Sequence, residues 1–339
     1  RSEVYFLSGV SIEAYPAMSN KISRAYGGKG GNLISKMASS IINEFVYTDS
    51  VKALHRNYKG TVGIRLIKKI DVDETVGLQN YIIPNLTVDD TLDFLASEAD
   101  SQDHIPYFMF YENSEGFNFK NLSNLIKQEV KEEYSYLPSN MDEGKGSPSD
   151  ENFDRTKLIS FDVIKQSNVI DNIQQGLYRS KTIHLDILKK TKREVIFNYD
   201  DYAPKFTKLQ PFKINGSLDT SPVVRMVTSR KGHDVDALFI DESPNPTKSN
   251  EVMGQSASYG QHIFNTVIEV SLPGDSELDV GNIIRLSIPS AATSADQDGD
   301  EDKYLSGKYI ITKLRHKMLD GTDSFTTILE CAKDTGTKL

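Results

Sequence analysis

The chain has 339 residues, of which 38% are hydrophobic and 26% charged, a composition typical of a soluble protein with two or more domains. The formal net charge of −9 argues against a general nucleic-acid-binding surface. The only cysteine, Cys331, excludes both a disulfide within the chain and a metal site built from several thiolates. No apolar run reaches the length that a transmembrane helix requires.

The first predicted elements are a strand over Glu3–Ile12 and a helix that begins near Asn32. The helix is predicted because apolar side chains recur at helical spacing along one face. These side chains are Leu33, Ile34, Met37, Ala38, Ile41, Ile42 and Phe45. The preceding run Gly27–Gly31 lacks the Gly-Lys-Ser/Thr ending of a phosphate-binding loop, since Gly30 follows Lys29, and we interpret it as a turn.

Residues 80–120 predict a second helix and a hairpin. Thr87 and Asp90 resemble a capping box at the start of a helix whose apolar positions are Leu92, Leu95, Ala96 and Ala99. The strand-forming runs Tyr107–Glu112 and Phe117–Lys120 flank the turn residues 113–116. Mixed helices and hairpins predict an α+β domain in this part of the chain.

The middle of the chain alternates between turn-rich and strand-forming segments. Ser139–Asp154 is rich in Gly, Ser, Pro and acids, which predicts a linker. Leu158–Asn198 returns to strand-forming residues. Pro244–Ser258 is again turn-rich and polar, so we expect a mobile loop there.

The C-terminal region shows the strongest pattern. Four runs alternate apolar and polar residues and are separated by Gly-, Pro- and Asp-containing turns: Val267–Leu272, Ile283–Ile288, Lys308–His316 and Ser324–Ala332. Such alternation predicts antiparallel strands with one face in a core, in a barrel or a sandwich. The expected core positions are Ile268, Val270, Leu272, Ile284, Leu286 and Ile288, with Cys331 as a small buried hydrophobe.

Polar residues alternate with these core positions and form the candidate interface. A strand of a barrel uses one face for the core and can present the other to a neighbouring subunit. The outward candidates are Glu269, Ser271, Arg285, Ser287, Lys313 and Arg315. The alternative for each of them is plain exposure to solvent.

No segment predicts catalysis or metal binding. A calcium loop counted from Asp296 requires Gly at its sixth position and Glu at its twelfth, but these are Glu301 and Gly307. The six histidines show no metal-ligand spacing. Glu112 and Glu115 could be paired acids for glycoside cleavage, but in a hairpin turn they are more simply exposed. We therefore predict no enzyme activity, no catalytic residue, no metal and no cofactor.

Three groups of short motifs, in this order along the chain, carry a resemblance to a known family. The first contains Tyr81–Pro84, Phe108–Asn113 and Gly116–Phe119; the second Phe161–Ile164, Val169–Ile173, Gly176–Tyr178 and Phe197–Tyr199; the third Pro273–Asp275, Val280–Asn282, Leu305–Ile311, Arg315–His316 and Thr327–Glu330. In this order they resemble the central baseplate hub proteins of contractile-tailed bacteriophages. The resemblance extends to the hub part of secretion-system spike proteins.

The resemblance implies an α+β chain with a discontinuous antiparallel β-barrel of tube type and an inserted α+β domain. We expect residues 1–15 to be the last strand of, or the exit from, an upstream tube barrel. The remaining divisions are 16–138, the α+β domain; 139–157, a linker; 158–199, the first part of the barrel; 200–264, an inserted segment packing with the α+β domain; 265–334, the second part of the barrel; and 335–339, a tail.

The implied function is structural. The chain would form a homotrimeric, pseudo-six-fold ring that joins the tail tube to the central spike, in the virion baseplate assembled in the host cytoplasm. Its partners would be further copies of itself, the spike protein, tube or tube-initiator proteins and baseplate wedge proteins. DNA would pass through the lumen without specific binding, so Arg285 and Arg315 are expected to pair with acids or to contact a neighbouring subunit.

Two alternatives to the phage hub remain open from the sequence. One is the hub region of a contractile injection or type VI secretion spike, which has the same architecture. The other is a tail-associated cell-wall hydrolase, which requires converging acids or a metal.

Overall fold

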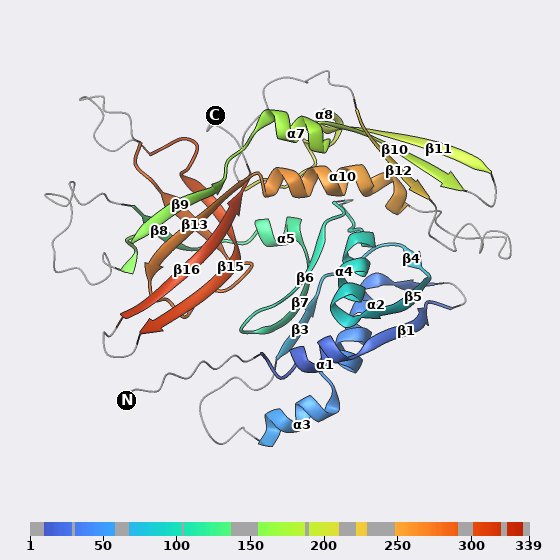
Figure 1. Ribbon diagram of the computed structural model, residues 1–339, viewed down its shortest axis with the longest axis horizontal. Helices are drawn as coiled ribbons and strands as arrows, with labels where there is room; N and C mark the ends of the chain where they lie inside the picture. Colours follow the sequence, from blue (N-terminus) through green and yellow to red (C-terminus); the bar gives the residue numbers. More distant parts are fainter. Residues whose placement is uncertain are drawn as a thin grey trace, which may run out of the picture. The chain divides into compact units, whose positions relative to one another are not determined.

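A computed structural model describes residues 10–28, 31–57, 68–103, 105–136, 155–186, 190–209, 222–228, 248–290, 301–319 and 324–334. The chain forms two compact units (Figure 1). The first contains Arg1–Asn121 and Thr228–Val252, and the second contains Leu122–Val227 and Met253–Leu339. Most of the predicted linker, residues 296–300 of the acidic run that was rejected as a calcium loop, and the C-terminal tail lie outside the described residues.

Within its described residues, the first unit contains five short helical segments and seven strands in three small sheets. In chain order the elements are α1 (Ala14–Ser19), β1 (Lys21–Tyr26), β2 (Asn32–Leu33), α2 (Ile34–Ile41), η1 (Ile42–Val46), α3 (Asp49–Asn57), β3 (Lys69–Val72), β4 (Leu78–Gln79), β5 (Tyr81–Thr87), α4 (Val88–Glu98), β6 (Phe108–Glu112) and β7 (Gly116–Asn121). The sheets pair β1 with β5, β2 with β4, and β3, β7 and β6 in that order. The unit is therefore a mixed α+β structure.

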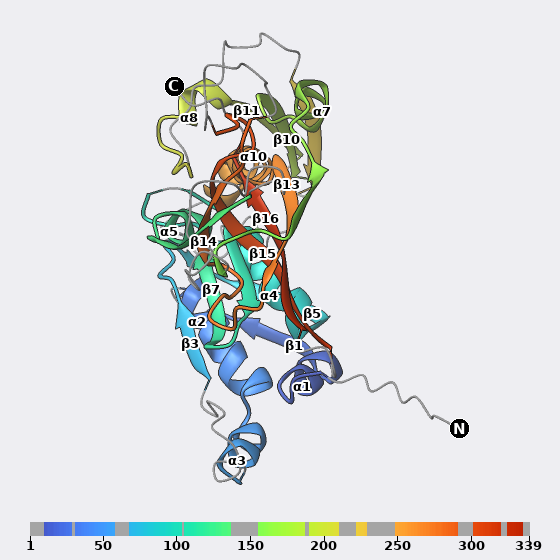
Figure 2. The ribbon, with the colours of Figure 1, turned by 90° about the vertical axis from the view of Figure 1, so that its left-hand side faces the viewer.

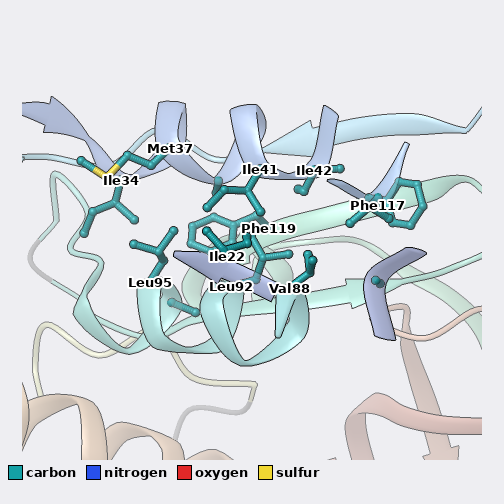
Figure 3. Packing of buried hydrophobic residues seen from close by; sticks show 14 of the residues in the cluster. Ile22, Ile34, Met37, Ile41, Ile42, Val88, Leu92, Leu95, Phe117 and Phe119 are labelled. Carbon is teal, nitrogen blue, oxygen red and sulfur yellow. The ribbon is translucent and has the colours of Figure 1, made fainter. Parts of the chain in front are cut away.

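The core of the first unit confirms the predicted helical stripe. Ile34, Met37, Ala38, Ile41 and Ile42 are each at most 1% exposed. Their side chains approach those of α4 and of the β3-β7-β6 sheet in Figure 3. The apolar face continues from α2 into η1, a π-helical turn, so the stripe spans two types of helix.

The second helix and the hairpin are also confirmed. The Thr87 side chain accepts a hydrogen bond from the Asp90 backbone N–H at 3.2 Å and caps α4, whose Leu92 and Leu95 are fully buried. Strands β6 and β7 pair antiparallel through a turn. Gly116 in that turn has a φ of 154°, and a Cβ placed there would lie 1.9 Å from the Lys69 carbonyl oxygen. Only glycine fits this position.

The second unit contains the C-terminal strands. In chain order its elements are α5 (Leu122–Ile126), β8 (Val130–Ser135), β9 (Ser160–Lys165), α7 (Val169–Gln175), β10 (Arg179–Asp186), β11 (Thr191–Asn198), α8 (Tyr199–Tyr202), β12 (Val223–Thr228), α10 (Lys248–Ile263), β13 (Thr266–Pro273), β14 (Ile283–Ser287), β15 (Gly307–Leu319) and β16 (Ser324–Lys333). Figures 1 and 2 show β13, β15 and β16 side by side as long twisted strands.

These strands belong to a curled six-stranded sheet in the order β8-β14-β15-β16-β13-β9. Its pairs are antiparallel except for β14 with β8, which is parallel. The described residues therefore show a curled, half-barrel sheet with one parallel pair, and a closed antiparallel barrel stays a prediction. The two ends of the sheet meet at one point, where the Ser135 N–H donates to the Thr156 carbonyl and the Leu158 N–H to the Ser135 carbonyl, both at 2.9 Å.

The strand β8 was not predicted as part of this sheet, because its sequence carries little alternation. Of its residues only Tyr134 is buried in the sheet's core, at 2% exposure, and three charged residues precede it. A strand with one core side chain has a weak period-two signal.

The domain limits predicted from the sequence stay a prediction.

A second sheet in this unit has the order β11-β10-β12. Strands β10 and β11, expected from the sequence to belong to the barrel, pair here with each other and not with the C-terminal strands, and only β9 from the 158–199 segment joins the six-stranded sheet. The predicted strand over Glu3–Ile12 is described only from residue 10, and residues 10–12 form no strand.

The predicted mobile loop Pro244–Ser258 is wrong over its described part, because α10 begins at Lys248. The helix packs closely on β10 and β11 through Gly254, where an added Cβ would lie 2.8 Å from the Phe197 Cβ. The Ser258 hydroxyl donates to the Leu177 carbonyl at 2.7 Å, and Tyr259 is fully buried. Small and polar residues thus mark a close helix-sheet contact here, although they are typical of turns.

Candidate interface on the six-stranded sheet

The six-stranded sheet has an apolar inner face. The predicted core positions Ile268, Val270, Leu272, Ile284 and Leu286 are fully buried, and Ile288 is 2% exposed. Cys331 is also fully buried, and burial raises the pKa of its thiol. A thiol with a raised pKa in an apolar core is unreactive, which confirms its prediction as a small buried hydrophobe.

On the outer face, the strand register places residues of β13, β16 and β15 in one row. Glu269 on β13 lies opposite Glu330 on β16, which lies opposite Lys313 on β15. The Lys313 Nζ contacts the Glu330 carboxylate at 2.8 Å. Cross-strand pairs of opposite charge stabilise a sheet by a few tenths of a kcal/mol to about 1 kcal/mol. Glu269 remains exposed beside this ion pair.

The next row on the same face contains Ser271 and Arg315. Ser271 lies opposite Ile328, and Ile328 lies opposite Arg315. The Arg315 side chain is exposed and forms no ion pair with another residue in the described ranges. Together with Lys313 and Lys317, it forms the basic row of β15, because these three residues alternate along one face of that strand.

Arg285 and Ser287 are held within the chain. The Arg285 guanidinium lies 3.4 Å from the Glu301 carboxylate and 4.0 Å from that of Glu133. The Ser287 hydroxyl donates to Glu301 at 3.0 Å. The expectation that Arg285 pairs with acids is confirmed. Glu301 comes from the acidic run that the sequence excluded as a calcium loop, and it serves here as an ionic partner.

The six predicted residues therefore divide into two groups. Arg285, Ser287 and Lys313 have ionic or hydrogen-bonding partners within the chain. Glu269 and Arg315 lie on the open outer face, and Ser271 is partly exposed beside them. Whether they contact a neighbouring subunit stays a prediction.

Sequence reasoning missed a set of exposed apolar residues around β9. Their exposed fractions are 58% for Ile159, 41% for Val163, 56% for Ile164, 51% for Val169 and 64% for Ile170. Met318 near the end of β15 is 71% exposed. Strand-forming residues such as Val and Ile gave the signal for a strand, but no pattern indicated that this strand lies at the edge of its sheet.

One of the two acids considered for glycoside cleavage is held in a structural contact. Glu112, one of the imagined paired acids, forms an ion pair with Lys68, which also lies 3.3 Å from the buried Glu13. Within the described ranges, no group of three or more His, Cys, Asp or Glu side chains is arranged to hold a metal ion. Among the helices that the structure describes, none is long and apolar enough to span a membrane.

Two basic side chains are buried within the second unit. The Lys333 Nζ donates to the Ser306 carbonyl at 3.0 Å and lies over the Tyr309 ring, and burial lowers the pKa of Lys333 to about 8. His262 at the end of α10 is 1% exposed. Burial, with a smaller contribution from the charge of Lys208, lowers the pKa of His262 to about 3, so its imidazole is neutral at neutral pH.

Comparisons with known proteins give no family and no close relative. No protein-family model matches the sequence, and no curated protein matches it significantly. Among solved structures, the chain is similar to a tail protein from Neisseria meningitidis MC58, with 9% identity, a TM-score of 0.48 and coverage of 96% of this chain and 73% of that one.

Two further solved structures show weaker similarity. The 43 kDa tail protein of prophage MuSo2 from Shewanella oneidensis has 8% identity and a TM-score of 0.45, with coverage of 94% of this chain and 69% of that one. A chain of a native gene transfer agent virion has 11% identity and a TM-score of 0.34, with coverage of 84% and 46%. All three TM-scores are below 0.5, so these similarities do not by themselves assign a function to this chain.

Proposed function

We propose that this chain is a structural hub subunit of a bacteriophage tail baseplate. It forms a homotrimeric ring that joins the tail tube to the central spike. The observation that carries the proposal is the curled six-stranded sheet, with its apolar inner face, polar outer face and open strand edges. A sheet of this kind is suited to assembly because its edge strands and outer face are available to other subunits.

Three motifs of the third group that resembles the hub family also support the proposal, because they lie at turns of this sheet. Gly274 contacts Phe325 so closely that an added Cβ would lie 1.9 Å from its ring, and the Gly274 N–H donates to the Phe325 carbonyl at 2.8 Å. Gly281 has a φ of 88° and donates to the Ile311 carbonyl. Gly307, with a φ of 136°, begins β15. These positions require glycine for geometric reasons.

In this proposal the partners are further copies of the chain, the spike protein, tube or tube-initiator proteins and wedge proteins. The chain itself catalyses no reaction, and any lytic activity belongs to the spike partner. DNA passes through the ring without specific binding. The location is the baseplate of the virion.

The proposal is tested by the oligomeric state of the complete chain, alone and mixed with the spike protein encoded beside it. Sedimentation and cryo-electron microscopy are expected to show a three-fold ring. Monomers under both conditions would contradict the proposal. The genes next to this one distinguish a phage, where capsid genes are expected, from an injection or secretion system.

A further inference from the structure

The long strand β15 has an edge without a partner. Strand β14 pairs with β15 only from Gly307 to Ile310, whereas β16 pairs with β15 as far as Leu319. From Lys313 to Leu319, the side of β15 away from β16 has no paired strand among the residues that the structure describes. Every residue from 315 to 318 is exposed, so none of the described segments covers this edge over that stretch.

The strand β9 forms a second open edge of the same sheet over Ser160–Lys165, beyond the point where Ser135 of β8 bonds to the residues just ahead of β9. It pairs only with β13, over Ser160–Lys165, in the part of the chain for which pairing is described. Val163 is 41% exposed and Ile164 is 56% exposed. With about 3.3 Å per residue, β9 is roughly 20 Å long and the open segment of β15 roughly 23 Å, so the two edges match in length.

We propose that the open edge of β15 in one copy of the chain pairs with β9 of a second copy. This inference rests on the proposed function, since it names the surface through which the ring assembles. The four strands β9, β13, β16 and β15 alternate in direction. A second copy rotated about an axis along the strands therefore presents its β9 antiparallel to β15, and the sheet continues without reversing direction.

Charge and shape select one register for this pairing. With Arg315 opposite Asp162, the basic row of β15 meets the acidic side chain of β9, and neither residue has an ion-pair partner in the described ranges. The same register places Met318, which is 71% exposed, opposite Ile159, which is 58% exposed. Opposite charges and paired apolar side chains are the contacts that stabilise neighbouring antiparallel strands.

The faces of the two strands agree with this register. Arg315 lies on the outer face of its sheet, and Asp162, opposite Glu269, lies on the outer face as well. Met318 and Ile159 lie on the inner side by alternation. Because two different edges meet, the interface is heterologous and repeated use of it generates a ring when the rotation closes.

Charge exchange in the complete chain provides the first test. Asp162→Lys and Arg315→Glu each place like charges opposite one another, and we expect each to weaken self-association by about tenfold or more in Kd, measured by sedimentation. The double variant restores opposite charges and is expected to recover association. Glu129→Lys, which makes the same change in net charge as Asp162→Lys at an exposed position ahead of β8, is the matched control and is expected to leave association unchanged.

Cysteine cross-linking provides the second test. The pair Asp162→Cys and Arg315→Cys is expected to form a disulfide between copies under mild oxidation, while the buried Cys331 does not compete. A disulfide within one chain is excluded, because β9 and β15 are separated by two strands and hence by about 14 Å. The pair Asp162→Cys and Lys308→Cys, with Lys308 in the part of β15 that β14 covers, is the control and is expected to remain uncrosslinked.

The outcomes separate this inference from the proposed function. A ring that forms normally in both charge variants and gives no Asp162→Cys–Arg315→Cys cross-link overturns the edge pairing and leaves the hub function standing. A chain that remains monomeric, alone and with its spike partner, contradicts both. Loss of association in the single variants, recovery in the double variant and a specific cross-link support the pairing.

Discussion

Buried Lys333 gives the chain an unusual response to alkaline pH. Lys333 is 1% exposed, and its ammonium group donates a hydrogen bond to the Ser306 carbonyl and lies over the face of the Tyr309 ring. Burial disfavours the charged form, which lowers the pKa of Lys333 to about 8 from its ordinary value of 10.5. The charged lysine therefore destabilises the folded state at neutral pH.

The sign and size of the effect follow from proton linkage. Between pH 8 and 10.5 the unfolded chain holds a proton on Lys333 that the folded chain has released, so the free energy of unfolding rises with pH. From pH 8 to pH 9.5 this rise amounts to about 1.5 kcal/mol. Above pH 10 the buried tyrosines reverse the trend, because burial raises the pKa of Tyr134, Tyr199, Tyr259 and Tyr309.

Lys333→Met tests this reasoning, because methionine keeps the aliphatic stem and removes the charge. Urea unfolding at pH 8.0 and pH 9.5 is expected to show the stability gain in the natural chain and not in the variant. Lys313→Met, at an exposed lysine of the same sheet, is the control and is expected to keep the gain. An equal gain in the natural chain and in Lys333→Met would refute the account of Lys333.

Three further predictions concern particular contacts. Gly254→Ala is expected to destabilise the second unit by about 1–3 kcal/mol in thermal unfolding, because the new methyl group overlaps the Phe197 Cβ, and an unchanged melting temperature would contradict the close packing of α10. Thr87→Ala removes the cap of α4 and is expected to cost about 1 kcal/mol, whereas Thr87→Ser is expected to retain most of it. His262 contributes stability that is lost as the pH falls below about 6.5, since its folded pKa is lowered to about 3. Acid unfolding of His262→Gln is therefore expected to begin at lower pH than in the natural chain, and an identical acid transition would refute this role.

Local sequence patterns were sufficient to predict those elements that bury one face in a core. The apolar stripe of α2, the Thr87 cap and the alternation in β13 each predicted the observed element and its buried side. These signals arise within ten or so residues, because side-chain direction repeats with the period of the element. The hairpin of β6 and β7 was predictable for the same reason.

Elements held by distant contacts were not predictable. α10 contains Gly254 and Ser258, which favour turns in isolation, and close packing against β10 and β11 stabilises it as a helix. β8 joins the six-stranded sheet in parallel to β14 from more than 140 residues away, and no local pattern encodes that pairing. The candidate interface was predictable only as an alternation of outward residues. The open edges of β9 and β15 depend on which strands pair, which is a property of the whole sheet.

The oligomeric state of the complete chain, alone and with its spike partner, tests the central claim most directly. Sedimentation and cryo-electron microscopy are predicted to show three copies in a closed ring around a central channel. A ring of a different number of copies, or monomers under both conditions, would contradict the account of this chain as a trimeric tail hub.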